Sequence, residues 1–290
     1  MTEWGVEHES IRSRRLRVGG VATWLRETGP ERASEAVLLL HGNPGSGADF
    51  DDLLPRIGRF ARAIAPDMPG FGLAERPRDF DYSVAGYARH IAAMLGELGV
   101  RRVHLVLHDF GGPWGLHWAV AHSQQVASVV LFNVGFLPGF RWHPVARLWR
   151  TPILGELAQL VATRRLVVAA VKRGNPMPFP KGFLERFYEH VDWPMKRAVL
   201  TLYRVTDNFE ELAKRGREVL APLSLPALVI WGEQDSYVPV RFAAQQQAYF
   251  AAEVHILADT GHWPMADQAE RVGGLVLPFL RRQLAKPSGH

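Results

Sequence analysis

Asp109 is the residue of this sequence whose type and position point most directly to chemistry. It comes shortly after residues 103–107, a short aliphatic run typical of a strand buried on both faces, and apolar residues at helical spacing resume from Pro113. Gly111 and Gly112 allow the close backbone approach that a sharp strand-to-helix turn needs. A side chain on such a turn stands beside a helix N-terminus, where backbone N–H groups favour negative charge. A carboxylate in this place can attack a saturated carbon that carries a leaving group, and water can then cleave the resulting ester.

Three further polar residues come shortly after predicted strands. They are Asn43 after residues 36–40, Asp235 after residues 227–231 and His262 after residues 254–257. Ligands of parallel sheets bind where the carboxyl ends of the strands meet, so we expect one sheet edge to bring these loops to Asp109. The order of nucleophile, acid and histidine along the chain is that of a hydrolase catalytic triad.

The spacing of the apolar runs predicts an α/β fold with a mostly parallel central sheet and helices on both faces. Strand and helix patterns alternate on either side of residues 135–220, and the hairpin pattern of residues 10–30 predicts an antiparallel entry to the sheet. Residues 135–220 show only helical segments broken by prolines, with unusually many aromatic residues. We predict two core segments, 1–134 and 221–290, and an inserted helical cap over 135–220. The aromatic residues of the cap could form its own core, line an apolar substrate chamber, or do both.

The composition excludes several classes of protein. The chain has 290 residues, a net charge of +5 and no cysteine, so disulfides, thiolate metal sites and a cysteine nucleophile are excluded. No apolar stretch reaches the roughly 20 residues of a membrane span, the N-terminus lacks the layout of a signal peptide, and no nucleic-acid-binding motif accompanies the scattered arginines. The glycine-rich stretches 42–47 and 70–72 lack the lysine of a phosphate loop and the third glycine of a dinucleotide fingerprint. We expect a cytoplasmic monomer or homodimer without metal or cofactor, and without a membrane or nucleic-acid partner.

Five motifs resemble those of the α/β-hydrolase superfamily, specifically its aspartate-nucleophile branch of epoxide hydrolases and haloalkane dehalogenases. They are residues 41–44 (HGNP), 67–72 (DMPGFG), 108–112 (HDFGG), 231–235 (WGEQD) and 261–264 (GHWP), and the resemblance covers nearly the whole chain. It implies the α/β-hydrolase fold with Asp109 as nucleophile, His262 as the base that activates water, and Asp235 as the residue that orients the histidine. It also implies an oxyanion hole made by the backbone N–H groups of Asn43 and Phe110.

The resemblance distinguishes two reactions by how the leaving group is stabilised. An epoxide oxygen needs a proton donor from the cap, and the segment around Tyr203 resembles the one that supplies it. No tyrosine occurs near the start of the cap, where a second donor is expected, so His143 is our candidate there. We therefore predict an epoxide hydrolase that converts small apolar epoxides and water to vicinal diols, with Trp142 and Tyr188 as substrate contacts.

A haloalkane dehalogenase acting by the same two steps is the main alternative. A halide is commonly held by the asparagine of an HGNP motif and by a tryptophan directly after the nucleophile. This sequence has Asn43 but has Phe110 in the second position, so another indole such as Trp114 or Trp142 would have to replace it. A non-catalytic ligand receptor on the same fold remains a third alternative, because fold alone does not determine function.

Overall fold

The computed structural model describes residues 10–173 and 175–286, and one eight-stranded sheet lies at its centre. The strands are β1 (Arg12–Val18), β2 (Val21–Thr28), β3 (Glu35–Leu40), β4 (Arg62–Asp67), β5 (Arg102–His108), β6 (Val126–Phe132), β7 (Pro226–Gly232) and β8 (Ala251–Leu257). Their spatial order is β1-β2-β4-β3-β5-β6-β7-β8, with β2 antiparallel to both neighbours and all other pairs parallel. The predicted mostly parallel sheet with an antiparallel hairpin entry is therefore confirmed. Residues 1–9, which the sequence predicts not to be a signal peptide, lie outside the described residues.

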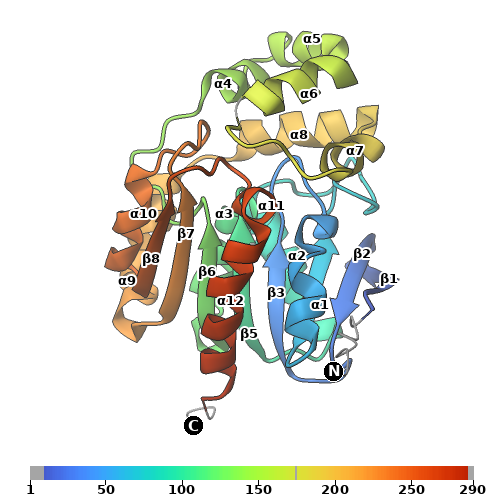
Figure 1. The fold of residues 1–290 in the computed structure, drawn as a ribbon. Coiled ribbons are helices and arrows are strands. Elements are labelled where there is room, and N and C mark those ends of the chain that lie inside the picture. The colour runs from blue at the N-terminus through green and yellow to red at the C-terminus, as the bar shows by residue number, and fades with distance from the viewer. Residues whose placement is uncertain (1–9, 174, 287–290) are drawn as a thin grey trace, which may run out of the picture.

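Helices cover both faces of the sheet, because alternate residues of each central strand point to opposite sides. Leu38 and Leu40 of β3 belong to a buried cluster with residues of α2 and α3, whereas Val37 and Leu39 belong to a second cluster with residues of α1 and α12. The helices of the core are α1 (Leu53–Gly58), α2 (Val84–Glu97), α3 (Gly111–Ala121), α10 (Arg241–Gln245), α11 (Pro264–Asp267) and α12 (Ala269–Leu284). Figure 1 shows α1 and α12 on the near face.

The inserted segment lies over the edge of the sheet where the parallel strands end (Figure 1). Its helices are α4 (Pro144–Arg150), α5 (Leu154–Val161), α6 (Arg164–Arg173), α7 (Phe183–Glu189), α8 (Trp193–Val205) and α9 (Phe209–Val219). No strand occurs among its described residues. Helix α9 contacts core helix α3, and Ala213 of α9 and Met195 of α8 belong to the same buried cluster as residues of α2 and α3. A helical cap is thus present, and the boundaries 135 and 220 stay a prediction. None of the described helices is both long and apolar enough to cross a bilayer.

Candidate active site

Asp109 occupies a tight turn between β5 and α3. Its φ of +47° lies in the left-handed region, which is unfavourable for residues other than glycine. A Cβ on Gly111 would lie 2.2 Å from the carbonyl oxygen of Leu40, and one on Gly42 would lie 2.3 Å from the Cβ of Asp109. Only glycine at both positions therefore lets the turn pack against β3 and the loop that follows it.

The carboxylate of Asp109 is held by both of its oxygens. Oδ1 accepts the backbone N–H of Asn43 at 2.7 Å, and Oδ2 lies 3.3 Å from Nε2 of His262. Burial alone would raise the pKa of Asp109, but the hydrogen bond and charge of His262, the nearby His108 and the N–H of Asn43 together lower it to about 2. Asp109 is consequently a carboxylate at neutral pH, as a nucleophile must be.

His262 lies between two carboxylates. Its Nδ1 donates to Oδ2 of Asp235 at 2.7 Å, and its backbone carbonyl accepts a hydrogen bond of 2.8 Å from Nε2 of the buried His108. Burial would lower the pKa of His262, but the charge of Asp235 and the hydrogen bonds to Asp109 and Asp235 raise it to about 10. In the free protein His262 is therefore a protonated imidazolium, and Asp109 is one of the two groups that keep it so.

Asp235 is fixed by a network that the sequence analysis did not find. Its Oδ1 accepts the backbone N–H groups of Tyr237 and Val238 at 2.7 and 2.9 Å, and its Oδ2 also accepts Nδ2 of Asn133 at 2.6 Å. Asn133 directly follows β6, has a φ of +50°, and links β7 to the histidine loop by accepting from the N–H of Gly232 and donating to a carbonyl of that loop. Asn133 comes directly after a strand that ends at the same edge of the sheet as the predicted triad. That position is the sequence feature by which it could have been included among the candidate site residues.

A cavity of about 370 Å³ opens above Asp109 between core and cap. Core residues line its floor, and α4, α5, α6 and α8 supply apolar and aromatic walls. Among the lining residues are Asn43, Phe110, Phe140, Trp142, His143, Trp149, Val161, Leu166, Val167, Tyr203 and Tyr237. Aromatic residues of the cap thus surround a chamber that Asp109 also lines.

Tyr203 and Asn43 meet at one side of this chamber. Nδ2 of Asn43 donates to the hydroxyl oxygen of Tyr203 at 3.3 Å. Burial, followed by the negative charge of Asp109, raises the pKa of Tyr203 well above its ordinary value, so the phenol keeps its proton. Because the phenol oxygen accepts in this contact, its own proton and the second amide proton of Asn43 remain for a leaving group.

The comparisons with known proteins agree with this architecture. Residues 35–269 match the family model described as alpha/beta hydrolase fold. The chain belongs to the α/β-hydrolase family. It is 27% identical over 278 residues to 2-hydroxy-6-oxo-2,4-heptadienoate hydrolase of Pseudomonas putida, covering 92% of this chain and 95% of that protein. The predicted α/β-hydrolase fold is therefore confirmed.

Two solved structures have the same fold over nearly their whole length. DbjA matches with a TM-score of 0.83 and 26% identity, over 95% of this chain and 99% of that one. The haloalkane dehalogenase DatA from Agrobacterium tumefaciens C58 matches with a TM-score of 0.82 and 21% identity, over 94% and 97% of the two chains. At that lower identity, the second match shows the shared fold alone.

Three other predicted residues of this α/β-hydrolase lie at the chamber. The ring of Phe110 stacks on Trp142 at a centroid distance of 6.1 Å and meets the edge of Tyr203 at 5.0 Å. His143 caps α4 by accepting the N–H of Ala146 at its Nδ1, which leaves Nε2 as the nitrogen that can donate to a ligand. These placements are compatible with the predicted roles of Trp142 in substrate contact and His143 in donating to the leaving group, and all three roles, including that of the Phe110 N–H in the oxyanion hole, stay predictions.

Two aromatic residues considered in the sequence analysis lie elsewhere. Tyr188 is a half-buried residue of α7 that packs against the second core cluster, and it is not among the residues that line the chamber. Trp114 is fully buried and stacks on Tyr87 of α2 at 4.1 Å, also away from the lining. The structure therefore does not bring Tyr188 to the site, and Trp114 is not the replacement halide donor.

Tyr237 is a chamber residue that the sequence analysis missed. Its ring lies 5.0 Å from that of His262 and 5.2 Å from that of His143. It comes two residues after Asp235, so the turn whose backbone N–H groups bind Asp235 also places this phenol beside His262. Its position within the loop of a predicted triad member was the available signal.

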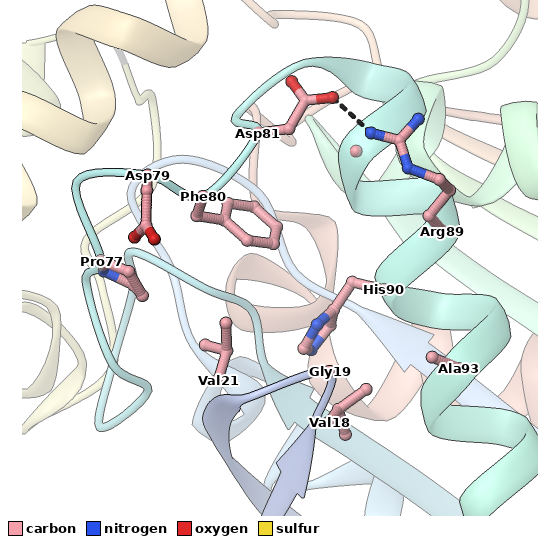
Figure 2. A pocket seen from close by; sticks show the side chains of 11 residues that line it. Val18, Gly19, Val21, Pro77, Asp79, Phe80, Asp81, Arg89, His90 and Ala93 are labelled. Atoms are coloured by element: carbon pink, nitrogen blue, oxygen red, sulfur yellow. Dashed lines mark hydrogen bonds and ion pairs between the residues drawn. The ribbon is translucent and has the colours of Figure 1, made fainter.

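A second hollow of about 380 Å³ lies between the β1–β2 turn and α2, as Figure 2 shows. Its polar side chains form an ion pair between Asp81 and Arg89, and a hydrogen bond of 2.8 Å between His90 and Thr23. Burial lowers the pKa of His90 to about 4, so this histidine is neutral. The residues around it include no nucleophile with an adjacent base, unlike those around Asp109. Within residues 10–173 and 175–286, no three histidine, aspartate or glutamate side chains converge as a metal site.

Proposed function

We propose that this α/β-hydrolase displaces a leaving group from a saturated carbon of an apolar substrate through a covalent ester on Asp109. The observation that carries the proposal is an ionised Asp109 at the floor of an apolar chamber, with Nε2 of His262 at 3.3 Å. In the first step an oxygen of Asp109 forms a bond to the substrate carbon. The bond to the leaving group breaks at the same time, and the leaving group departs with the electron pair.

In the second step water hydrolyses the ester. Ester formation removes the negative charge of Asp109, and with it one of the two carboxylates that keep His262 protonated. The pKa of His262 then falls, so the imidazolium releases its proton to solvent, and the neutral imidazole accepts a proton from the water that attacks the ester carbonyl. The N–H of Asn43, at 2.7 Å from Oδ1 in the free protein, would stabilise the developing oxyanion together with that of Phe110.

A halide is the leaving group that we place first. The second amide proton of Asn43 and the hydroxyl proton of Tyr203 are two neighbouring donors, with their heavy atoms 3.3 Å apart, in a mostly apolar chamber, and such a pair can bind a halide. The haloalkane dehalogenase DatA has this fold, and that likeness shows the shared fold alone, so the choice of halide depends on the two donors rather than on the comparison. The hydrolysis of a dienoate, as named for the relative from Pseudomonas putida, fits less well, because the described chamber lining holds no arginine or lysine to pair with a carboxylate.

Epoxide opening, which the sequence analysis favours, is the second candidate, and one observation supports it. Tyr203 is a buried phenol beside Asp109 that accepts a hydrogen bond from Asn43, so it can give its own proton to a ring oxygen as the carbon–oxygen bond breaks. His143 could donate a second hydrogen bond from Nε2.

The two candidates are separated by offering the purified protein a bromoalkane and an aryl epoxide in parallel and measuring bromide and diol. Bromide release with little diol supports the first candidate, and diol without bromide supports the second. The Asp109→Asn variant should abolish either activity. Absence of both products from the parent protein, or full activity of the variant, would contradict the proposal and favour a ligand receptor.

A further inference from the structure

The outer surface of the cap exposes an apolar helix face. The residues concerned are Ile153, Leu154, Leu157, Leu160 and Val161, which belong to α5 or directly precede it, and between 50% and 73% of each is exposed. We call these five residues the cap face. Single exposed apolar residues are ordinary in globular proteins, but a contiguous set on one helix indicates contact with another apolar phase. In Figure 1, α5 and α6 are the outermost helices, on the far side of the cap from the sheet.

The cap face continues into the catalytic chamber. Val145, Leu148, Val161 and Leu166, from α4, α5 and α6, line the chamber and are also between 40% and 65% exposed. They therefore form an apolar rim where the chamber opens to the outside. An apolar molecule that enters here would not have to cross a polar surface.

The same segment carries the positive charge of the chain. Residues 141–173 contain seven arginines and lysines and one acidic residue, a net charge of +6 within a chain of +5, so the rest of the chain is slightly negative. The one acid, Glu156, is already paired with Arg204 at 2.7 Å. Arg147, Arg164 and Lys172 are exposed, and no ion pair to them is found in the described part of the chain.

We propose that the cap face docks onto an anionic lipid bilayer, so that apolar substrate passes from the lipid through the rim into the chamber. An apolar helix flanked by arginine and lysine is the pattern of segments that lie in a bilayer interface without spanning it. A symmetric second copy would place two segments of net charge +6 against each other, whereas an anionic lipid surface compensates that charge. The sequence analysis predicts no membrane partner because it finds neither a membrane span nor a signal peptide. Docking on the surface of a bilayer needs neither of them, so the proposal departs from that prediction.

The test is co-sedimentation of the full chain with vesicles of phosphatidylcholine alone, or of phosphatidylcholine mixed with phosphatidylserine. We expect binding to the mixed vesicles that is lost on adding salt, and little binding to phosphatidylcholine alone. Arg164→Glu/Arg165→Glu should weaken binding by at least about 25-fold, because each basic side chain near an anionic surface contributes roughly fivefold. Leu160→Glu should also weaken it.

The matched controls are exposed residues of the same types outside the cap. Arg32→Glu/Arg101→Glu carries the same change of charge, and Leu223→Glu introduces the same polar group at a leucine that is 40% exposed. Both controls should bind like the parent, and circular dichroism should be unchanged throughout.

Equal binding to both lipid compositions, equal loss in cap and control variants, or a solution dimer that Leu160→Glu dissociates would overturn the proposal. Because vesicle binding is measured without substrate, a protein that binds vesicles but releases neither bromide nor diol would refute only the proposed function.

Discussion

The Asp109→Asn variant tests whether the negative charge of Asp109 controls the protonation of His262. The two side chains are 3.3 Å apart, and the asparagine resembles the ester intermediate in carrying no charge. At that distance, unit charges interact by roughly 1–5 kcal/mol for an effective dielectric constant between about 80 and 20. This energy corresponds to a pKa change of about 1–4 units. Since Asp235 stays in place, the pKa of His262 should fall from about 10 by at least about one unit without reaching the value of a buried, unpaired imidazole.

The measurement is a pH titration of the imidazole ¹⁵N signals by NMR. The chain contains 12 histidines, so the signal of His262 is assigned by its absence in His262→Gln. Asp79→Asn, at an exposed carboxylate beside the hollow of Figure 2, serves as the control and should leave the titration unchanged. An equally unchanged titration in Asp109→Asn would refute the reasoning, because ester formation then could not convert His262 into a base.

Three further results are expected. Tyr203→Phe should lower the steady-state rate of epoxide hydrolysis about 10²–10⁴-fold. The rate of bromide release should fall less, because the side-chain amide of Asn43 can still donate to the halide. Asn133→Gly keeps the positive φ but removes the amide from Asp235, so the free energy of unfolding in urea should fall by about 2 kcal/mol together with the rate; unchanged stability would contradict the role of the network. Burial of the imidazole lowers the pKa of His90 to about 4 in the folded protein, so the unfolded chain binds a proton first as pH falls, and this contribution to stability is lost progressively below pH ~6.5. His90→Gln should therefore reduce the loss of unfolding free energy between pH 7 and 5 by about 2 kcal/mol, as measured by urea unfolding at each pH; an unchanged pH dependence would contradict this expectation.

The strand-end residues of the site were predictable because parallel strands bring their carboxyl ends to one edge. Asp109, Asp235 and His262 each follow a short apolar run, and each lies in a recognisable motif. Their convergence therefore follows from local patterns and the topology of the sheet. The fold was predictable for the same reason, including the hairpin at its start.

The contacts that support the predicted triad were harder to predict, because the position of Asn133 after a strand places it at the right edge of the sheet but does not say which side chain it contacts. Asn133 donates to Asp235 although the two residues are 102 positions apart in the sequence. Its backbone has a positive φ, which the neighbouring residues of the sequence do not predict. Tyr188 was expected at the substrate, but a helical pattern does not say against which neighbour the helix packs, and α7 places Tyr188 against another part of the core. The cap is where packing between helices, rather than periodicity, decides which side chains reach the chamber.

The most direct test of the covalent mechanism is a single turnover in ¹⁸O-labelled water with enzyme in excess over whichever substrate the parallel assay identifies. We predict that mass spectrometry of the digested protein finds the label in the peptide that contains Asp109, because water attacks the ester carbonyl and one oxygen stays on the enzyme. Label found only in the alcohol or diol product would show direct attack of water on the substrate and would contradict the account.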